Sequence, residues 1–141
     1  IWSGKLKSLP KSIGRLKNLR KLSVIRHKMK KLPESMGNLT SLERLELGGN
    51  ELQVLPEWIG NLQSLQFLEV IGNRLATLPK SLGDLNSLKE LHLSRNALTS
   101  LPESMVSLIP PLGYVSLVDN PIRKYPNWLK EMEDWGVRVV K

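Results

Sequence analysis

A step of 23 residues runs through most of this chain, and it constrains the fold more than any other feature of the sequence. Asparagines stand 23 residues apart at Asn50, Asn73 and Asn96, and Asn120 follows 24 residues later. The same step separates five Leu-Pro pairs, at Leu9-Pro10, Leu32-Pro33, Leu55-Pro56, Leu78-Pro79 and Leu101-Pro102. A period of this length indicates a chain built from stacked copies of one small structural unit.

Each unit contains an alternating stretch followed by a turn. In Leu45-Glu46-Leu47 a polar residue separates two apolar ones, which indicates a strand with one buried face. One short strand cannot bury its face alone, whereas stacked copies form a continuous parallel sheet. The recurring asparagine carries donor and acceptor groups that can satisfy backbone atoms where the chain leaves the strand. The proline ends the strand side because it cannot donate to a ladder, and glycines at positions 14, 37, 60 and 83 indicate tight turns on the return side.

Within one unit, the pattern L-x-x-L-x-L-x-x-N-x-L is met by Leu42, Leu45, Leu47, Asn50 and Leu52. This pattern resembles the signature of the leucine-rich-repeat family. The second half of the unit, L-P-x-x-[I/L/M]-G-x-L, resembles the 23-residue variant of intracellular Ras-linked scaffold proteins, their plant relatives and many bacterial proteins. The resemblance implies an α/β solenoid with a curved parallel sheet on its concave face and turns or short 3-10 helical segments on its convex face. It also implies an interaction scaffold, since this class mostly binds other proteins.

The pattern divides the chain into an array and a cap. We expect a repeat array over residues 1–122, with about five to six turns of which the first is partial, and a C-terminal cap over residues 123–141. Asn127 can cap a helix that runs to about Trp135, and Gly136 can stop it. Apolar side chains of this helix are expected to cover the open end of the last turn, namely Trp128, Leu129, Met132 and Trp135. Ile1 already occupies a strand position, so the other cap is expected upstream.

Two positions depart from the pattern. His27 stands where the ladder requires asparagine, and its imidazole can replace one of the two amide bonds, so the first full repeat is expected to be looser. We take this as a tolerated substitution, with a pH-sensitive contact as the alternative. The last repeat has an extra residue near Pro110-Pro111, where two prolines in series predict a stiff bulge on the return side. That bulge is either a length accident near the end of the array or a protrusion toward a partner.

The residues that alternate with the buried leucines define the predicted binding surface. They line up in columns on the concave side, at a strand spacing of about 4.8 Å. The columns combine apolar patches, an acidic centre and basic flanks, which resembles a binding hot spot for a protein partner. The alternative is a surface without function, because single exposed apolar residues are common. The predicted partner-binding residues are Trp2, Ile25, Arg26, Arg44, Glu46, Phe67, Glu69, Ile71, Glu90, His92, Arg95 and Tyr114.

Catalytic and metal-binding patterns are weak. The chain has no cysteine and two histidines far apart in the sequence, which excludes thiolate chemistry and disfavours a metal site. Glu69, His92 and Ser116 share one column in the order acid, base and nucleophile. A serine on a flat strand nevertheless lacks the sharp turn and the oxyanion donors of a hydrolase. We therefore expect no enzyme, no cofactor and no metal. Asn38 matches a glycosylation acceptor, but repetition explains it, because Asn61 has the same place in its repeat.

The distribution of charge gives a second hypothesis. Residues 1–33 contain eleven basic residues and no acidic one, while the whole chain has a net charge of +8. Most of these side chains lie off the columns, so we expect them on the return face and the turns. There they could bind a polyanion, such as nucleic acid or an anionic lipid membrane, or an acidic protein. The alternative is a solvated surface that only aids solubility.

The setting of the chain is a further expectation. No apolar stretch is long enough for a membrane span. The lack of cysteine favours a cytoplasmic location, with a bacterial secreted or surface location as the alternative. We expect a monomer or a part of a longer chain. The third hypothesis for function is therefore the recognition domain of a larger effector or signalling enzyme.

Overall fold

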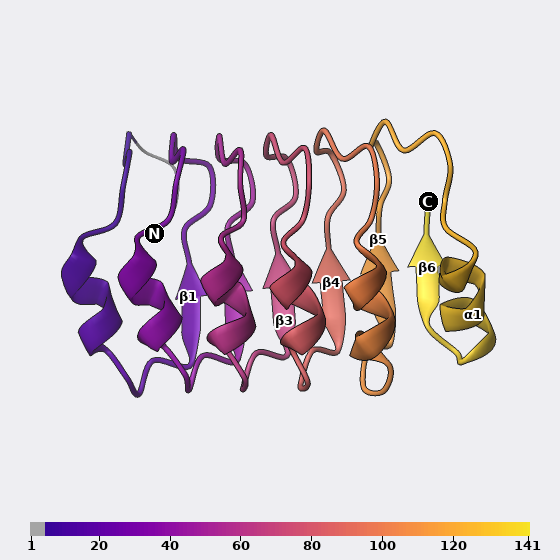
Figure 1. Cartoon of the computed structure of the whole chain (residues 1–141). Helices are drawn as coiled ribbons and strands as arrows, with labels where there is room; N and C mark the ends of the chain where they lie inside the picture. The colour runs from indigo at the N-terminus through magenta and orange to yellow at the C-terminus, as the bar shows by residue number, and fades with distance from the viewer. Residues whose placement is uncertain (1–4) are drawn as a thin grey trace.

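The computed structural model describes residues 5–141, which form a row of stacked turns (Figure 1). Each turn of the repeats contributes one strand to a sheet and one helical segment to the opposite side of the molecule. In this part of the chain the strands form one six-stranded parallel sheet, whose order follows the sequence. The strands are β1 (Lys21–Ser23), β2 (Arg44–Glu46), β3 (Phe67–Glu69), β4 (Glu90–His92), β5 (Tyr114–Ser116) and β6 (Arg138–Val140).

The helical segments of the repeats are 3-10 helices, as the resemblance implied. Each begins directly after the proline of a Leu-Pro pair. Pro56, for example, has a φ of −68° and a ψ of 155°, so it is the last extended residue before the chain turns. The segments are η1 (Lys11–Arg15), η2 (Glu34–Asn38), η3 (Glu57–Asn61), η4 (Lys80–Asp84) and η5 (Glu103–Leu108).

The glycines of these segments allow close packing between neighbouring turns. A Cβ atom on Gly14 would collide with Ser35 O, and one on Gly83 would collide with Ser104 O. Neither glycine has a positive φ. The sequence predicted a tight turn at these positions, but the physical reason for glycine is the approach of the next helical segment, which leaves no space for a side chain.

The leucines of the pattern form a continuous core between the sheet and the helical segments. Leu45, Leu68 and Leu91 are the central residues of β2, β3 and β4, and all three are completely buried. Burial of one such side chain stabilises the fold by about 1.5–3 kcal/mol relative to its exposed state. Stacking is what buries them, because each strand is covered by its neighbours and by the segment opposite.

The recurring asparagine joins neighbouring turns through hydrogen bonds between its side chain and the backbone. Asn73 Nδ2 donates to the carbonyl oxygens of Leu47 at 2.9 Å and Val70 at 3.1 Å. Its Oδ1 accepts from the backbone N–H of Leu52 at 3.0 Å. One side chain therefore satisfies backbone groups of two turns, as predicted. The same arrangement recurs at Asn50, Asn96 and Asn120.

His27 interrupts this ladder. Its side chain is only 6% exposed, and neither ring nitrogen has a hydrogen-bond partner in residues 5–141. The expected replacement of an amide bond is therefore not made within this part of the chain. A rigid ring holds its two nitrogens at fixed positions and cannot reproduce the adjacent oxygen and NH₂ of an amide. The turn remains attached through its backbone, because the N–H of Lys28 donates to Leu6 O at 3.1 Å.

The C-terminal segment contains the helix α1 (Trp128–Asp134), close to the predicted bounds. Gly136 ends it as predicted, with a φ of 90° and an N–H that donates to Glu133 O at 2.9 Å. Asn127 precedes the helix but makes no capping hydrogen bond through its side chain. No helix in residues 5–141 has the length and apolar character needed to cross a lipid bilayer.

The helix covers the last repeat with fewer side chains than expected. Leu129 and Met132 are buried, and Trp128 is partly buried against the core. Trp135 is 76% exposed, so the prediction that it covers the last turn is wrong. The reason is its position after the last helical residue, where the chain has left the helical path and the spacing of seven residues no longer points to the core.

Strand β6 was not predicted from the sequence. It follows α1 and pairs with β5 in the parallel sense, so the sheet continues past the repeats. The N–H of Leu117 donates to Val140 O at 2.7 Å, and the N–H of Arg138 donates to Gly113 O at 2.9 Å. The cap thus covers the core with α1 and extends the sheet with β6.

The extra residue of the last repeat lies on the predicted side of the molecule. Segment η5 has six residues, whereas the other four 3-10 segments have five. Figure 1 shows a wider loop between η5 and β5 than in the preceding repeats. The insertion is therefore absorbed by the return path, and the register of β4 with β5 is unchanged.

Candidate functional site

The exposed side of the sheet, which we call the strand face, carries the residues that alternate with the buried leucines. The register pairs Arg44 with Phe67 and Glu46 with Glu69, and it continues in this way across the sheet. Equivalent residues of successive repeats therefore stand in columns, as predicted. The strand face comprises Lys21, Arg44, Phe67, Glu90, Tyr114 and Arg138; Ser23, Glu46, Glu69, His92, Ser116 and Val140; and Ile25, Gly48, Ile71, Ser94 and Val118.

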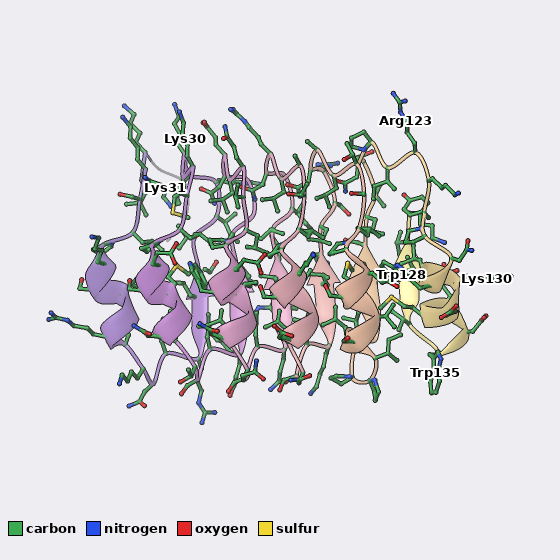
Figure 2. All side chains as sticks on the ribbon, viewed as in Figure 1. Lys30, Lys31, Arg123, Trp128, Lys130 and Trp135 are labelled. Carbon is green, nitrogen blue, oxygen red and sulfur yellow. The ribbon has the colours of Figure 1, made fainter. Side chains whose placement is uncertain are left out.

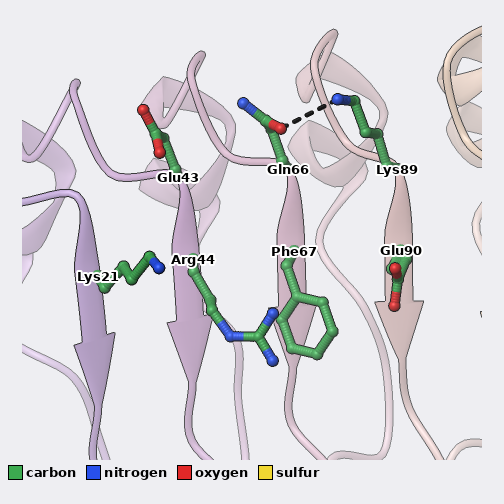
Figure 3. A pocket seen from close by; sticks show the side chains of 7 residues that line it. All are labelled: Lys21, Glu43, Arg44, Gln66, Phe67, Lys89 and Glu90. Atoms are coloured by element: carbon green, nitrogen blue, oxygen red, sulfur yellow. Dashed lines mark hydrogen bonds between the residues drawn. The ribbon is translucent and has the colours of Figure 1, made fainter.

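A row of flat side chains crosses the strand face from β2 to β6, and we call it the aromatic row. The Arg44 guanidinium carbon lies 3.5 Å from the centroid of the Phe67 ring, and Figure 3 shows the two side by side. The ring centroids of Phe67 and His92 are 4.9 Å apart, as are those of His92 and Tyr114. The guanidinium of Arg138 lies 5.9 Å from the Tyr114 ring. These are cation-π and tilted ring contacts, so each member is held in place by its neighbours.

Two close pairs of polar side chains lie on the strand face. Arg44 Nε lies 2.7 Å from Glu46 Oε1. His92 Nε2 lies 3.1 Å from Glu90 Oε2. In both pairs the partners are two residues apart on one strand. The surface is therefore polar and charged without a large local excess of either sign.

Glu69 and Glu46 occupy one column but have opposite electrostatic environments. Burial raises the pKa of Glu69, and the neighbouring charge of Glu46 raises it further. The Glu69 carboxylate lies over Gly48, where a Cβ atom would collide with Glu69 Oε1. Burial also acts to raise the pKa of Glu46, but hydrogen bonds from Arg44 and Ser23 outweigh it and hold that pKa below its usual range. Glu69 is thus the more costly carboxylate to keep ionised.

The column of Glu69, His92 and Ser116 is not connected as a catalytic triad. His92 Nε2 faces Glu90 instead of the serine. Ser116 is only 5% exposed, and its Oγ accepts a hydrogen bond from Ser94 Oγ at 2.9 Å. In the part of the chain that the structure describes, no three His, Cys, Asp or Glu side chains come together in a way that could hold a metal ion.

A hollow of about 240 Å³ lies where the central strands begin (Figure 3). Within it, Lys89 Nζ donates to Gln66 Oε1 at 3.1 Å. The sequence predicted part of this site, because Arg44, Phe67 and Glu90 are among the predicted partner-binding residues. It missed Glu43, Gln66 and Lys89, each of which stands one position before a strand. Their shared position in the repeat could have indicated that they lie side by side. The hollow is lined by Lys21, Glu43, Arg44, Gln66, Phe67, Lys89 and Glu90.

The remaining predicted residues are placed as follows. Ile25 and Ile71 lie on the strand face and are partly buried. Arg26 and Arg95 have φ values of 59° and 57°, so they stand at the turn after the strand, at the border of the face. Trp2 lies outside the described residues. Arg138 was missed, because β6 lies beyond the last repeat and no periodic signal marks it.

Comparison of the sequence with known protein families agrees with the repeat structure. A model described as "Leucine-rich repeat region" matches residues 1–74, and a model described as "Leucine Rich Repeat" matches residues 87–108. The chain belongs to the leucine-rich-repeat family. Proteins with leucine-rich repeats generally act as protein–protein interaction modules and are typically not catalytic. No curated protein sequence matches the chain closely enough to name a relative.

Solved structures place this leucine-rich-repeat chain among similar solenoids. It is similar to a leucine-rich-repeat protein of Leptospira interrogans, with a TM-score of 0.88 and 32% identity, over 97% of this chain and 35% of that chain. It also resembles a chain of the Toll–Spätzle complex of Drosophila, with a TM-score of 0.77 and 23% identity, over 89% of this chain and 18% of that chain. The second likeness shows the fold alone. The leucine-rich-repeat chain thus spans 35% of the Leptospira protein.

Proposed function

We propose that this chain is a non-catalytic module that binds another protein on its strand face. The observation that carries the proposal is the aromatic row, in which Arg44, Phe67, His92, Tyr114 and Arg138 contact one another over five strands. Aromatic and arginine side chains contribute much of the binding energy at protein interfaces. A row of them on an open sheet face offers a partner a broad area of contact.

The mutual contacts of the row lower the cost of binding. Ordering a flexible side chain at an interface costs about 0.5–1.5 kcal/mol. Phe67 lies between Arg44 and His92, so much of that cost has been met during folding. The ion pair of Arg44 with Glu46 lowers a second cost, that of burying a charge at the interface, because neither group has to enter it unpaired. The face is therefore preorganised.

The proposal is tested with a variant that removes the apolar contacts of the strand face. Phe67→Ser combined with Ile71→Ser should weaken capture of a partner from a cell extract by at least about tenfold, which corresponds to the loss of a hot spot. The partners recovered with the unchanged chain and with the variant are quantified by mass spectrometry. Capture should persist at raised salt, since apolar contacts are not screened.

A matched control removes two exposed apolar side chains elsewhere. Leu16 and Val106 are 51% and 39% exposed and lie off the strand face. Leu16→Ser combined with Val106→Ser should leave capture unchanged. Equal recovery of the same partners with both double variants, at equal thermal stability, would refute the strand face as the binding surface.

The same proposal includes the cellular location of the chain and its place in a longer protein. We place the partner first in the cytoplasm, because a chain without cysteine fits a reducing compartment. We also propose that the module acts within a longer protein, which its coverage of 35% of the Leptospira chain supports.

A further inference from the structure

The positive charge of the molecule is concentrated on one edge of the solenoid. This edge, which we call the cationic edge, is where the chain passes from each strand to the next 3-10 segment, at the top of Figure 1. It includes the matching stretches before η1 and α1, and it leaves out the turn residues Arg26, Arg95 and Asp119, which border the strand face. So defined, it contains eight basic residues and one acidic residue, a net charge of +7 where the whole chain has +8. The basic residues of the cationic edge are Lys5, Lys7, Lys28, Lys30, Lys31, Arg74, Arg123 and Lys124.

This distribution corrects the expectation of one basic patch made by the N-terminal third. The structure separates those side chains, because the two passages between strand and helical segment lie on opposite edges. Arg15 is the last residue of η1, and Lys17 and Arg20 lie between η1 and β1, on the edge where the chain returns to the strand. Lys30 and Lys31 lie on the cationic edge, together with Arg123 from the other end of the molecule (Figure 2).

The cations of this edge are available to a ligand. Arg74 is paired with Glu51, at 3.5 Å between Nη2 and Oε2. None of the other seven basic side chains makes an ion pair or a side-chain hydrogen bond within residues 5–141, and all seven are exposed. Four of them line a hollow of about 380 Å³ together with Glu51, namely Lys7, Lys28, Lys30 and Lys31.

The composition of the edge selects the kind of anion. Val54 occupies the position of Lys31 in the next repeat and is 62% exposed, so an apolar side chain lies beside the lysines. Basic side chains next to an exposed apolar one suit the surface of an anionic bilayer, where the lysines meet headgroup phosphates and the apolar side chain enters the interface. Lysine binds phosphate as a point charge and needs no fixed direction of approach.

Nucleic acid fits the same edge less well. Binding of single strands relies on aromatic side chains that stack on bases. The aromatic residue of the described cationic edge is Tyr125, and its ring is covered by Lys141, whose Nζ lies 5.5 Å from the centroid. Base recognition in a duplex uses arginine forks or amide side chains, whereas the dense part of this edge contains lysines.

We propose that the cationic edge docks the solenoid on an anionic phospholipid surface. The strand face lies beside this edge, so a docked molecule would keep its aromatic row open to a protein partner. The proposal goes beyond the binding of that partner and does not depend on it.

The experiment compares binding to vesicles of phosphatidylcholine with and without phosphatidylserine, measured by co-sedimentation. The unchanged chain should bind only the anionic vesicles, and binding should fall steeply with added salt. The triple variant Lys7→Gln, Lys30→Gln and Lys31→Gln should bind at least about tenfold more weakly, because each basic residue near an anionic surface strengthens binding severalfold.

A control variant with the same change in net charge tests whether binding depends on the position of the removed charges. Arg15→Gln, Lys17→Gln and Lys130→Gln also remove three positive charges, all from exposed residues off the cationic edge. This variant should bind anionic vesicles within about threefold of the unchanged chain. Thermal melts confirm that both triple variants remain folded, as expected for exposed lysine and arginine side chains.

Three results would overturn the proposal. The first is equal binding to neutral and anionic vesicles, or no binding to either. The second is an equal loss in the two triple variants, which would show a response to net charge alone. The third is tighter binding of a short single-stranded or duplex DNA than of the anionic vesicles, with the same sensitivity to the edge variant, which would assign the edge to nucleic acid.

Discussion

The strand face and the cationic edge differ in how their charges are arranged. On the strand face, Arg44 is bound to Glu46 and stacked on Phe67. On the cationic edge, Lys30 and Lys31 have no ion-pair partner in the described chain. The first surface holds its central arginine in contacts with its own residues and suits a partner that adds apolar contact. The second has left them for an external anion, so its binding energy depends on salt.

The difference begins with position in the repeat. Residues on the strand face stand about 4.8 Å from their equivalents on the next strand, which brings opposite charges and rings into contact. Residues on the cationic edge lie outside the strands. Neighbouring turns are joined there through the backbone, as from Arg74 N–H to Leu52 O, while the basic side chains are exposed. Repetition of one position therefore produces ordered rows of contacting side chains on the strand face. On the cationic edge it produces a group of exposed basic side chains.

The largest expected contrast is in stability. Leu68 is completely buried beneath the strand face, between Phe67 and Glu69. Leu68→Ala should lower the free energy of unfolding by about 2–5 kcal/mol, through lost burial and the cavity that remains. Lys30→Ala on the cationic edge should change it by less than about 0.5 kcal/mol. Urea melts measure both, and a loss below about 0.5 kcal/mol for Leu68→Ala would show that no packed core supports the face.

The next effect concerns the ladder that joins the face to the edge. Asn73→Ala removes hydrogen bonds to Leu47, Val70 and Leu52 and leaves buried backbone groups unpaired. We expect a loss of about 2–3 kcal/mol in urea unfolding. The reciprocal variant His27→Asn should gain about 1 kcal/mol, by completing the ladder where it is interrupted. Destabilisation by His27→Asn would mean that packing around the ring outweighs the missing bonds.

A smaller effect tests the order of the aromatic row. Phe67→Leu keeps an apolar side chain but removes the ring that contacts Arg44 and His92. It should cost about 0.5–1.5 kcal/mol in chemical denaturation. Val54→Leu on the cationic edge is the matched control and should be neutral, since the side chain is 62% exposed. Equal effects of the two variants would show that the row has no stacking energy.

The smallest expected effect is the pH dependence of two carboxylates in one column. The pKa of Glu69 is raised above its ordinary 4.5, so its folded form holds a proton that the unfolded form has lost. Stability should therefore fall as pH rises through that window, and Glu69→Gln should remove the fall and stabilise at neutral pH. The pKa of Glu46 is lowered, so its contribution is present above 4.5 and is lost as pH falls through the lowered value.

Glu46→Gln should thus destabilise the chain at neutral pH, opposite in sign to Glu69→Gln. Thermal melts between acid and neutral pH compare the two variants with the unchanged chain. A shift in the same direction for both would show that their shared column, and not the separate contacts of each carboxylate, sets their ionisation.

The repeat predicted the sheet, the 3-10 segments and the columns, because every copy reports the same local structure. The spacing of Asn50 and Asn73 predicts the ladder of asparagine hydrogen bonds, and the alternation around Leu68 predicts the strand face. Side-chain contacts between repeats could not be predicted in the same way. Phe67 stacks on His92, which belongs to the neighbouring column, and this contact depends on side-chain directions that the spacing does not give. Strand β6 has no equivalent upstream, so periodicity could not find it.

The basic residues show a different limit. Counting them by stretch of sequence suggested one patch, whereas a turn of 23 residues passes both edges of the molecule. Lys17 and Lys30 are close in sequence, yet they lie on opposite edges. Grouping charges by position within the repeat would have separated them, and would also have joined Lys30 with Arg123.

The interruption at His27 has a consequence for how the molecule opens. From Asn50 to Asn120 each turn is fastened to the one before it by a side chain that binds the backbone of both. The segment before His27 lacks that fastening and rests on packing and main-chain bonds. Opening fluctuations should begin there, so backbone amides of η1 would exchange with solvent deuterium before those of η3, and the solenoid would loosen from one end toward the other.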